Sequence, residues 1–205
     1  MRDSNRPFPF PLRAGASRLR LAVIADDDFM RLPENIRPAD ILLSLGDVHP
    51  HTVARAVRLF RPQRMFVVHG NHDIPGPWPE GMEDLHGRSA RAFGLTFAGL
   101  CGSLRYKSTP GFMLTQEKAR AVMMRLPAVD VLISHNSPAG YHEQNDFAHQ
   151  GFQAVTEYID RHAPALVLHG HQHVNAVSRR GRTLIAGVFG CRVFELRLDT
   201  LKTPE

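Results

Sequence analysis

The sequence has 205 residues and a mass of 23.0 kDa, which suits one domain with a sizeable core. Hydrophobic residues make up 43% and charged residues 22%, a mix that excludes a disordered or fibrous chain. The net charge of +5 suits an anionic partner, but it is weak evidence alone.

Membrane and secreted classes are also disfavoured by the sequence. No apolar run approaches the roughly 18 residues of a membrane span, and residues 1–20 lack the continuous apolar stretch of a secretory signal. Cys101 and Cys191 are too few for a disulfide framework. We therefore expect a cytoplasmic protein with both thiols reduced and no membrane partner.

Short apolar runs alternate with helical patterns along the chain. Residues 1–18 predict an extended, basic, proline-containing arm. Buried strands are predicted at 19–25, 39–45, 64–69, 95–102, 129–135 and 165–170. Helices are predicted at 52–60, 115–126 and 151–162. The first of them has Thr52 as its expected cap.

Two further stretches complete the pattern. Residues 74–87 are rich in proline and glycine and predict a surface loop. The last third of the chain predicts antiparallel strands with a turn at 180–182, before a tail at 200–205. The sequence thus indicates one α/β domain over 19–199, with a mixed sheet or pair of sheets covered by helices.

Five of the predicted strands end in side chains that bind metals. They are Asp26, Asp27 and Asp28; Asp47; Asn71, His72 and Asp73; His135; and His171 with His173. The carboxyl ends of strands in α/β proteins meet at a common crevice, and carboxylates gathered there need a cation to remain satisfied. Carboxylate, carboxamide and imidazole ligands suit Mn²⁺, Fe, Ni²⁺ or Zn²⁺. At least six ligands predict two ions, roughly 3.5–4 Å apart.

The order of these motifs is itself informative. In sequence they are Asp26-x-Asp28, Gly46-Asp47, Gly70-Asn71-His72-Asp73, Ser134-His135 and Gly170-His171-Gln172-His173. This set resembles the calcineurin-like metallophosphoesterase superfamily over about residues 19–174. The element His149-Gln150-Gly151 is similar to one in a compact branch of that superfamily. The resemblance implies an αββα sandwich in a single domain, with two mixed sheets flanked by helices.

The resemblance also implies a role for each matching residue. Asp47 would bridge two divalent ions, Asp26 and His173 would bind the first, and Asn71, His135 and His171 would bind the second. Mn²⁺ is favoured, with Fe, Ni, Zn and Mg as alternatives. The ions would activate a bridging water.

The catalytic pair that the resemblance implies is His72 with Asp73. His72 would donate a hydrogen bond to the phosphate or protonate the leaving oxygen, and Asp73 would hold its imidazole.

One residue departs from the family pattern. Asp28 stands where the family usually has histidine. As a ligand it would be harder and more negative, which favours Mn²⁺ or Mg²⁺ at the first site and makes the bound water less acidic. The alternative is that Asp28 points elsewhere and the first site is weak or empty.

Other residues have both a functional and a structural interpretation. Arg105 and Tyr106 are candidates to reach the substrate, against a plain surface loop, and His149 is a candidate against a structural role. His169 ends a strand, where a hydrogen bond supporting a ligand is favoured over ligation. His142 has the pattern of an ordinary surface histidine.

We therefore expect a metal-dependent phosphoric ester hydrolase, most simply a phosphodiesterase for small phosphodiester or cyclic-nucleotide-like substrates. The alternatives are a DNA or RNA nuclease using the same site, and a non-catalytic metal-binding scaffold. The chain shows no added nucleic-acid module and no long basic patch, which disfavours the nuclease. A scaffold would need neither His72 nor the near-complete ligand set.

Overall fold

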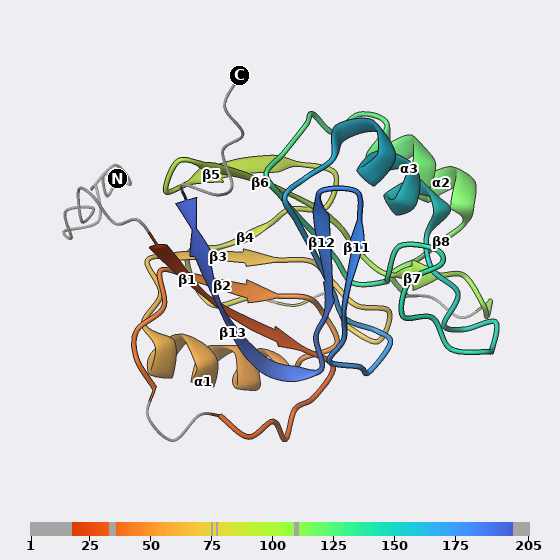
Figure 1. The fold of residues 1–205 in the computed structure, drawn as a ribbon. Helices are drawn as coiled ribbons and strands as arrows, with labels where there is room; N and C mark the ends of the chain where they lie inside the picture. The colour runs from red at the N-terminus through yellow and green to blue at the C-terminus, as the bar shows by residue number, and fades with distance from the viewer. Residues whose placement is uncertain (1–17, 33–35, 75, 77, 109–110, 199–205) are drawn as a thin grey trace, which may run out of the picture.

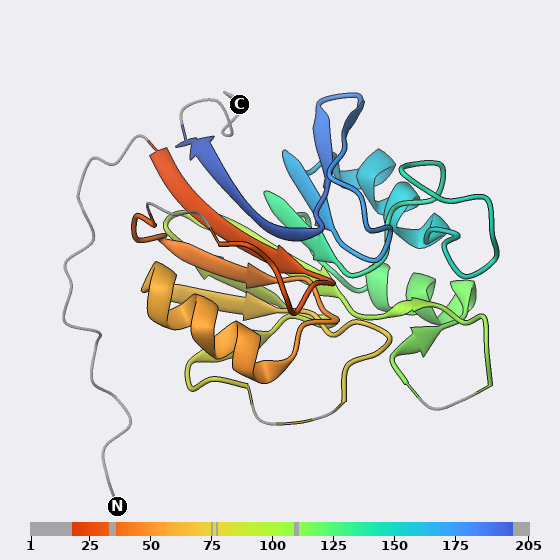
Figure 2. The same cartoon turned by 90° about the horizontal axis from the view of Figure 1, so that it is seen from below.

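The computed structural model describes residues 18–32, 36–74, 76, 78–108 and 111–198. The expected arm, apart from Arg18, and the expected tail at 200–205 lie outside the described residues. Two large mixed sheets pack face to face, and helices cover their outer faces (Figures 1 and 2). The expected α/β sandwich with two mixed sheets is confirmed.

The first sheet holds the strands nearest the start of the chain. Its order is β13 (Gly190–Arg197), β1 (Arg18–Ala25), β2 (Ile41–Ser44), β3 (Arg64–Val67) and β4 (Met82–Asp84). The strands β1, β2 and β3 are parallel, whereas β13 is antiparallel to β1. Their carboxyl ends therefore open at one edge of the sheet.

The second sheet comes mainly from the middle of the chain. Its order is β11 (Val177–Arg180), β12 (Thr183–Gly187), β10 (Leu166–His169), β9 (Val131–Ser134), β6 (Leu95–Leu100) and β5 (Ser89–Ala92). A small third sheet pairs β7 (Ser103–Leu104) with β8 (Met113–Leu114). The four strands β6, β9, β10 and β12 are parallel, so this sheet also has a common carboxyl edge.

Alternation along the strands divides the apolar residues into layers. In β1, Leu21 and Val23 face the layer between the two sheets, whereas Ala22 and Ile24 pack outward. The outward residues meet the helix α1 (Pro50–Phe60). On the far side, α2 (Gln116–Met123) and α3 (Gln153–His162) cover the second sheet. The buried layers fix both sheets and leave their carboxyl edges free for polar groups.

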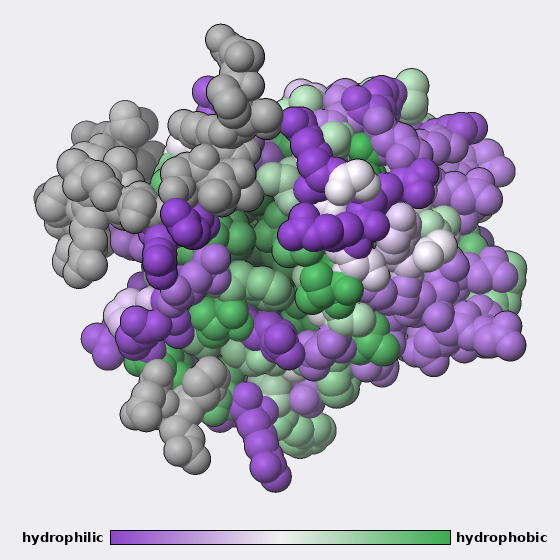
Figure 3. Space-filling model, in the orientation of Figure 1, coloured by the Kyte–Doolittle hydropathy of each residue, from purple (hydrophilic) through white to green (hydrophobic). Residues whose placement is uncertain are grey.

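The inner layer reaches the surface beside β13. Leu184, Phe194 and Leu196 are only partly buried and pack against that layer. Figure 3 shows green, hydrophobic surface on the face where Figure 1 places β12 and β13. Among the described residues, the apolar inner layer is therefore partly exposed along this seam.

Some local expectations differ from the structure. The predicted loop at 74–87 contains β4, which extends the first sheet by pairing with β3. The first helix begins at Pro50, and its cap is His49 rather than Thr52, because proline fits the first helical turn and the His49 ring accepts the His51 N–H. Strand β5 also lies outside the strands predicted. None of the helices in the described part of the chain is long and apolar enough to cross a membrane.

Candidate metal centre

The carboxyl ends of the two sheets bring distant motifs together. Asp26 follows β1, Asp47 comes just after β2, and His135 follows β9. One ligand atom from each of these three residues lies within 4.8 Å of the others. The Asn71 side chain reaches the same place, because its Oδ1 is 3.1 Å from His135 Nε2. Four of the predicted ligands therefore converge.

The converging groups fit a divalent cation. The side chains of Asp26 and Asp47 are only 1% and 11% exposed, and that of His135 is fully buried. Asp26 Oδ1 is buried without a hydrogen-bond partner, which is costly for a carboxylate unless a cation faces it. Carboxylate and imidazole donors in this arrangement are suited to Mn²⁺, Fe, Ni²⁺ or Zn²⁺.

The protonation of the three groups reflects their crowding. Burial raises the pKa of Asp26 to about 7, despite the nearby His135. Burial also opposes charge on Asp47 and His135, but their mutual attraction outweighs it, so the pKa of Asp47 falls to about 2 and that of His135 rises to about 9. Without a metal ion His135 is therefore protonated, and its positive charge offsets the negative charge of Asp47, as a bound cation would.

Two glycines allow the strand-end loops to meet. A Cβ at Gly46, whose φ is +95°, would lie 2.2 Å from the Gly70 nitrogen. A Cβ at Gly70 would lie 2.0 Å from Asp47 Oδ1. Because no side chain fits at either position, the backbones of the two motifs touch and Asp47 is set beside the Asn71 loop.

Several predicted ligands have left-handed backbone conformations. Asp26, Asp47, His171 and His173 have φ of 58°, 52°, 64° and 51°. Such a conformation costs roughly 1–2 kcal/mol for a residue with a Cβ. Four of the eight non-glycine residues with positive φ in the described chain thus lie where the carboxyl edges of the two sheets meet, as is typical of a functional site held by its surroundings.

The two histidines after β10 lie at different depths. His171 is buried; its N–H donates to Asp26 Oδ2 at 2.8 Å, and its ring is 5.0 Å from that of His135. The imidazole of His173 is 55% exposed, with Nε2 3.9 Å from Asp26 Oδ1. The structure therefore brings both beside Asp26, His171 inside and His173 at the mouth.

The predicted catalytic pair is arranged differently from expectation. His72 is exposed, and its backbone N–H donates to Asp47 Oδ1 at 2.7 Å. Asp73 instead accepts the Gly70 N–H at 2.7 Å and lies 3.9 Å from His69 Nδ1. Within the described chain no hydrogen bond joins Asp73 to His72, because the Asp73 carboxylate closes the turn at Gly70.

Asp28 does not enter the cluster of Asp26, Asp47 and His135. It is exposed, and its Oδ1 accepts the backbone N–H of His49 at 2.6 Å. Its placement therefore agrees with the alternative in which Asp28 points elsewhere, and its role as a ligand stays a prediction.

The candidate substrate residues divide into two groups. Tyr106 and His149 adjoin the site: the Asn71 amide donates to the Tyr106 hydroxyl at 3.4 Å, and the His149 ring lies 5.1 Å from that of His171. Asp146 accepts from His149 Nδ1 at 2.7 Å. Arg105 instead donates to the Met113 carbonyl at 3.0 Å, so its guanidinium is engaged beside β8.

A chain of hydrogen bonds supports the last motif, and part of it was missed from the sequence. Burial lowers the pKa of His169 to about 3, so its ring is neutral. Its Nδ1 donates to the Gly170 carbonyl at 2.9 Å, and its Nε2 pairs with His142 Nδ1 at 2.8 Å. His142 Nε2 in turn pairs with the Ser178 hydroxyl at 2.9 Å. His142 is thus not an ordinary surface histidine, and its isolated place in a loop gave no signal of this.

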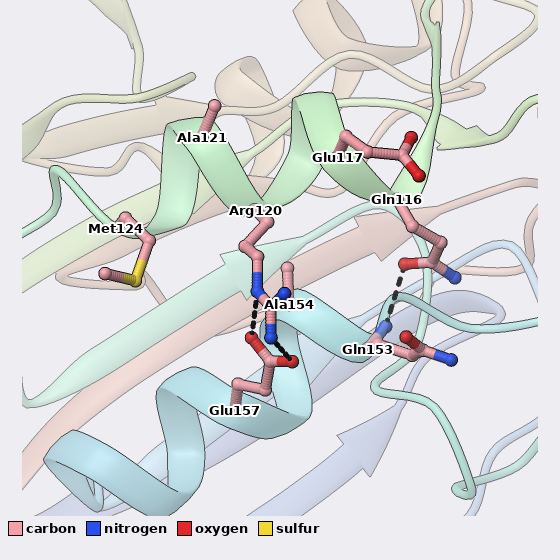
Figure 4. A pocket seen from close by; sticks show the side chains of 8 residues that line it. All are labelled: Gln116, Glu117, Arg120, Ala121, Met124, Gln153, Ala154 and Glu157. Carbon is pink, nitrogen blue, oxygen red and sulfur yellow. Dashed lines mark hydrogen bonds and ion pairs between the residues drawn. The ribbon is translucent and has the colours of Figure 1, made fainter.

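A groove between α2 and α3 lies away from the metal-ligand cluster. Figure 4 shows its lining, in which Arg120 and Glu157 form a two-bond ion pair and Gln116 accepts from the Gln153 backbone. The polar groups in this groove mainly join the two helices, so they indicate packing rather than chemistry.

Comparisons with known proteins agree with the geometry. Residues 21–188 match the model of the calcineurin-like phosphoesterase superfamily domain. The fold is similar to that of the phosphopantetheinyl hydrolase from Mycobacterium tuberculosis, with a TM-score of 0.58 and 13% identity over 92% of this chain and 99% of that one. It is also similar to the protein TT1561 of Thermus thermophilus, with a TM-score of 0.56 and 15% identity over 90% and 96% of the two chains. No curated protein matches the chain.

The contact between the two motif glycines is testable. In Gly70→Ala the new methyl group would displace the Asp47 carboxylate, so we expect Mn²⁺ affinity to fall by about 10- to 100-fold in calorimetric titration. Gly76→Ala is the matched control, since a Cβ there meets no described atom nearer than the Ile74 carbonyl oxygen at 3.7 Å. Equal Mn²⁺ affinity in the two variants would contradict this account of the site.

Metal binding should release protons. The pKa of His135, about 9, and that of Asp26, about 7, lie above their ordinary values, and both groups must lose their protons to bind a metal. Affinity for Mn²⁺ should therefore rise from pH 6 to pH 8, with about one to two protons released near pH 7. Titrations in two buffers of different ionisation enthalpy measure this number. An affinity that is constant over this range would refute the proposed ligands.

Proposed function

The chain belongs to the calcineurin-like phosphoesterase superfamily, and from this premise we propose that it is a metal-dependent phosphoric ester hydrolase, specifically a phosphodiesterase. The observation that carries the proposal is the convergence of Asp26, Asp47 and His135, joined by the Asn71 carboxamide, at the shared edge of two sheets. In this proposal Asp47 would hold both of two divalent ions, for which Mn²⁺ is the favoured metal.

The ions, when bound, would polarise the phosphoryl oxygens and make coordinated water acidic. The protein contributes the geometry. The carboxyl groups of Asp26 and Asp47 are buried in a site with little solvent, where their electrostatic interaction with a cation would be strong. Both residues have left-handed backbone, a strained conformation of the kind that is held by the surrounding structure at functional sites.

His72 is proposed as the residue that meets the substrate. Its exposed side chain is free to donate to a phosphoryl or leaving oxygen, while its backbone N–H holds Asp47. The Tyr106 hydroxyl, beside the Asn71 amide, lies at the same edge and supports a second substrate contact. We propose small phosphodiesters as the substrate class, because the open site carries no covering domain in the described chain.

The activity itself is the first test. Mn²⁺-loaded protein should hydrolyse bis-p-nitrophenyl phosphate, lose activity with chelator and regain it on addition of Mn²⁺. Asp47→Asn, purified in the same way, controls for contaminating phosphatases. Turnover of p-nitrophenyl phosphate in parallel measures the preference for diesters. Metal-loaded protein that turns over neither compound would favour the scaffold alternative.

The role of His72 is separable from metal binding. His72→Ala keeps the backbone N–H that holds Asp47 but removes the imidazole, so we expect turnover to fall by about 10²- to 10⁴-fold with metal content unchanged. His162→Ala, at the end of α3, is the control histidine. Steady-state rates and elemental analysis measure the two quantities. Metal loss in His72→Ala would assign His72 to the ligand set instead.

A further inference from the structure

A line of polar groups leads from the edge strand of the second sheet toward Asp26. It starts at Ser178 on the edge strand β11 (Figure 1) and passes through the rings of His142 and His169. The Ser178 hydroxyl lies 2.9 Å from His142 Nε2, and His142 Nδ1 lies 2.8 Å from His169 Nε2. His169 Nδ1 then lies 2.9 Å from the Gly170 carbonyl oxygen. Three hydrogen bonds thus connect β11 with the turn that follows β10.

The chemistry of these groups gives each hydrogen bond one direction. A carbonyl oxygen only accepts, so the Gly170 oxygen requires a proton on His169 Nδ1. The His169 ring is fully buried, where a positive charge is costly, so it is neutral and its Nε2 carries a lone pair. That Nε2 accepts from the His142 Nδ1–H. A neutral His142 ring then accepts from the Ser178 hydroxyl at Nε2, so every donor points toward Gly170.

The line of hydrogen bonds reaches Asp26 through one peptide group. The Gly170 carbonyl, which accepts from His169, and the His171 N–H belong to the same planar unit. That N–H donates to Asp26 Oδ2 at 2.8 Å. In a trans peptide the oxygen and the hydrogen point in opposite directions, so holding one of them orients the other. Because a rotation of this peptide group would break both hydrogen bonds, the His169 ring fixes the donor that holds Asp26.

The contact with this peptide determines which Asp26 oxygen is left for a cation. Oδ2 accepts the His171 N–H, whereas Oδ1 is buried without a hydrogen-bond partner. A Cβ at Gly170 would lie 2.5 Å from Oδ2, so the turn approaches the carboxylate only because this residue has no side chain. The Gly170 N–H is held as well, since it donates to the His135 carbonyl at 2.9 Å. The turn after β10 therefore sets the orientation of the Asp26 carboxylate.

The rings of His142 and His169 lie in a space that is shaped around them. They adjoin Gly187, at the end of β12, where a Cβ would be 3.1 Å from His169 Cε1 and 3.3 Å from His142 Nδ1. His142 itself has a left-handed backbone, with a φ of 58°. A strained residue of this kind is held by its surroundings and is common at functional sites. Both features indicate that the contact between the two rings is specific.

We infer that His142 is a positioning residue of the metal centre, which acts through His169 to orient the Asp26 carboxylate for metal binding. Ser178 extends the chain by holding the His142 ring. This inference rests on the proposed function, since it requires a divalent ion at Asp26. Losing a hydrogen bond that holds a metal ligand typically lowers metal affinity by about 10- to 100-fold. Because His142 acts through intermediate groups, we expect an effect at the lower end of this range.

Two substitutions at one position separate the hydrogen bond from the packing of the ring. His142→Phe keeps an aromatic ring but removes the Nδ1–H, so we expect Mn²⁺ affinity to fall by about tenfold in calorimetric titration. His142→Asn has an amide nitrogen near the place of Nδ1 and can still donate to His169, so its affinity should stay within about threefold of wild type. His162→Phe, at the end of α3, is the matched control and should bind Mn²⁺ as the wild-type protein does.

The outcomes of these titrations distinguish the inference from the proposed function. Wild-type protein that binds no Mn²⁺ would end the proposed function and the inference with it. Mn²⁺ binding by the wild type, with an equal affinity in His142→Phe, would overturn the inference alone. A loss of affinity in His142→Phe that His142→Asn shares would assign the effect to ring packing, and this result would also overturn the inference.

A measurement on the wild-type chain tests the hydrogen bonds directly. The proton positions derived above make His142 and His169 Nδ1–H tautomers. Two-bond ¹H–¹⁵N spectra of the chelator-treated whole chain distinguish Nδ1–H from Nε2–H rings. The signals of each ring are identified by their absence from His142→Phe or His169→Gln. We expect both rings in the Nδ1–H form at about pH 8. An Nε2–H form of His169 would leave the Gly170 carbonyl without this donor and would overturn the inference.

Discussion

The approach of Gly46 to Gly70 is the constraint on which the site depends. The two loops come from neighbouring parallel strands, and only residues without a Cβ allow their backbones to touch. This contact puts the Asp47 carboxylate against the Gly70 turn, where the His72 N–H holds it. The contact between these two glycines therefore couples the positions of the Asp47 carboxylate, the Asn71 carboxamide and the proposed substrate residue His72. Each would move if the loops separated.

The electrostatics of the site follow from that crowding. Two carboxylates and an imidazole share a buried corner, so the favourable state is one in which His135 carries a proton or a cation replaces it. The left-handed backbone at Asp26 and Asp47 adds local strain. This strained backbone is held in place by the two sheets and by the contact between Gly46 and Gly70, rather than by the side chains of Asp26 and Asp47. A divalent ion bound here would give the buried Asp26 Oδ1, which has no hydrogen-bond partner, a charged partner.

The sequence was sufficient for the fold and for the set of converging residues because both depend on strand ends. An apolar strand followed by Asp26 or His135 identifies a residue at the sheet edge. The parallel order of the strands then brings such residues to the same edge. Side-chain direction was not predictable in this way. Asp28 turns to the His49 N–H and Asp73 to the Gly70 N–H, and both choices depend on local turns that a motif does not encode. The place of His142 depends on a loop folding back onto β10.

The metal-ligand cluster and the exposed side chains on the loops beside it differ in how far a substitution would disturb the structure. The cluster is buried and over-determined: changing one of its residues disturbs the others through shared hydrogen bonds and charge. Phe29 and Ile74 are exposed and contact little, so either can change without disturbing the fold. The cluster can therefore be kept while the exposed side chains beside it change. The superfamily match can therefore account for the metal-ligand cluster of this chain, whereas the exposed side chains of the neighbouring loops are free to differ from those of its relatives.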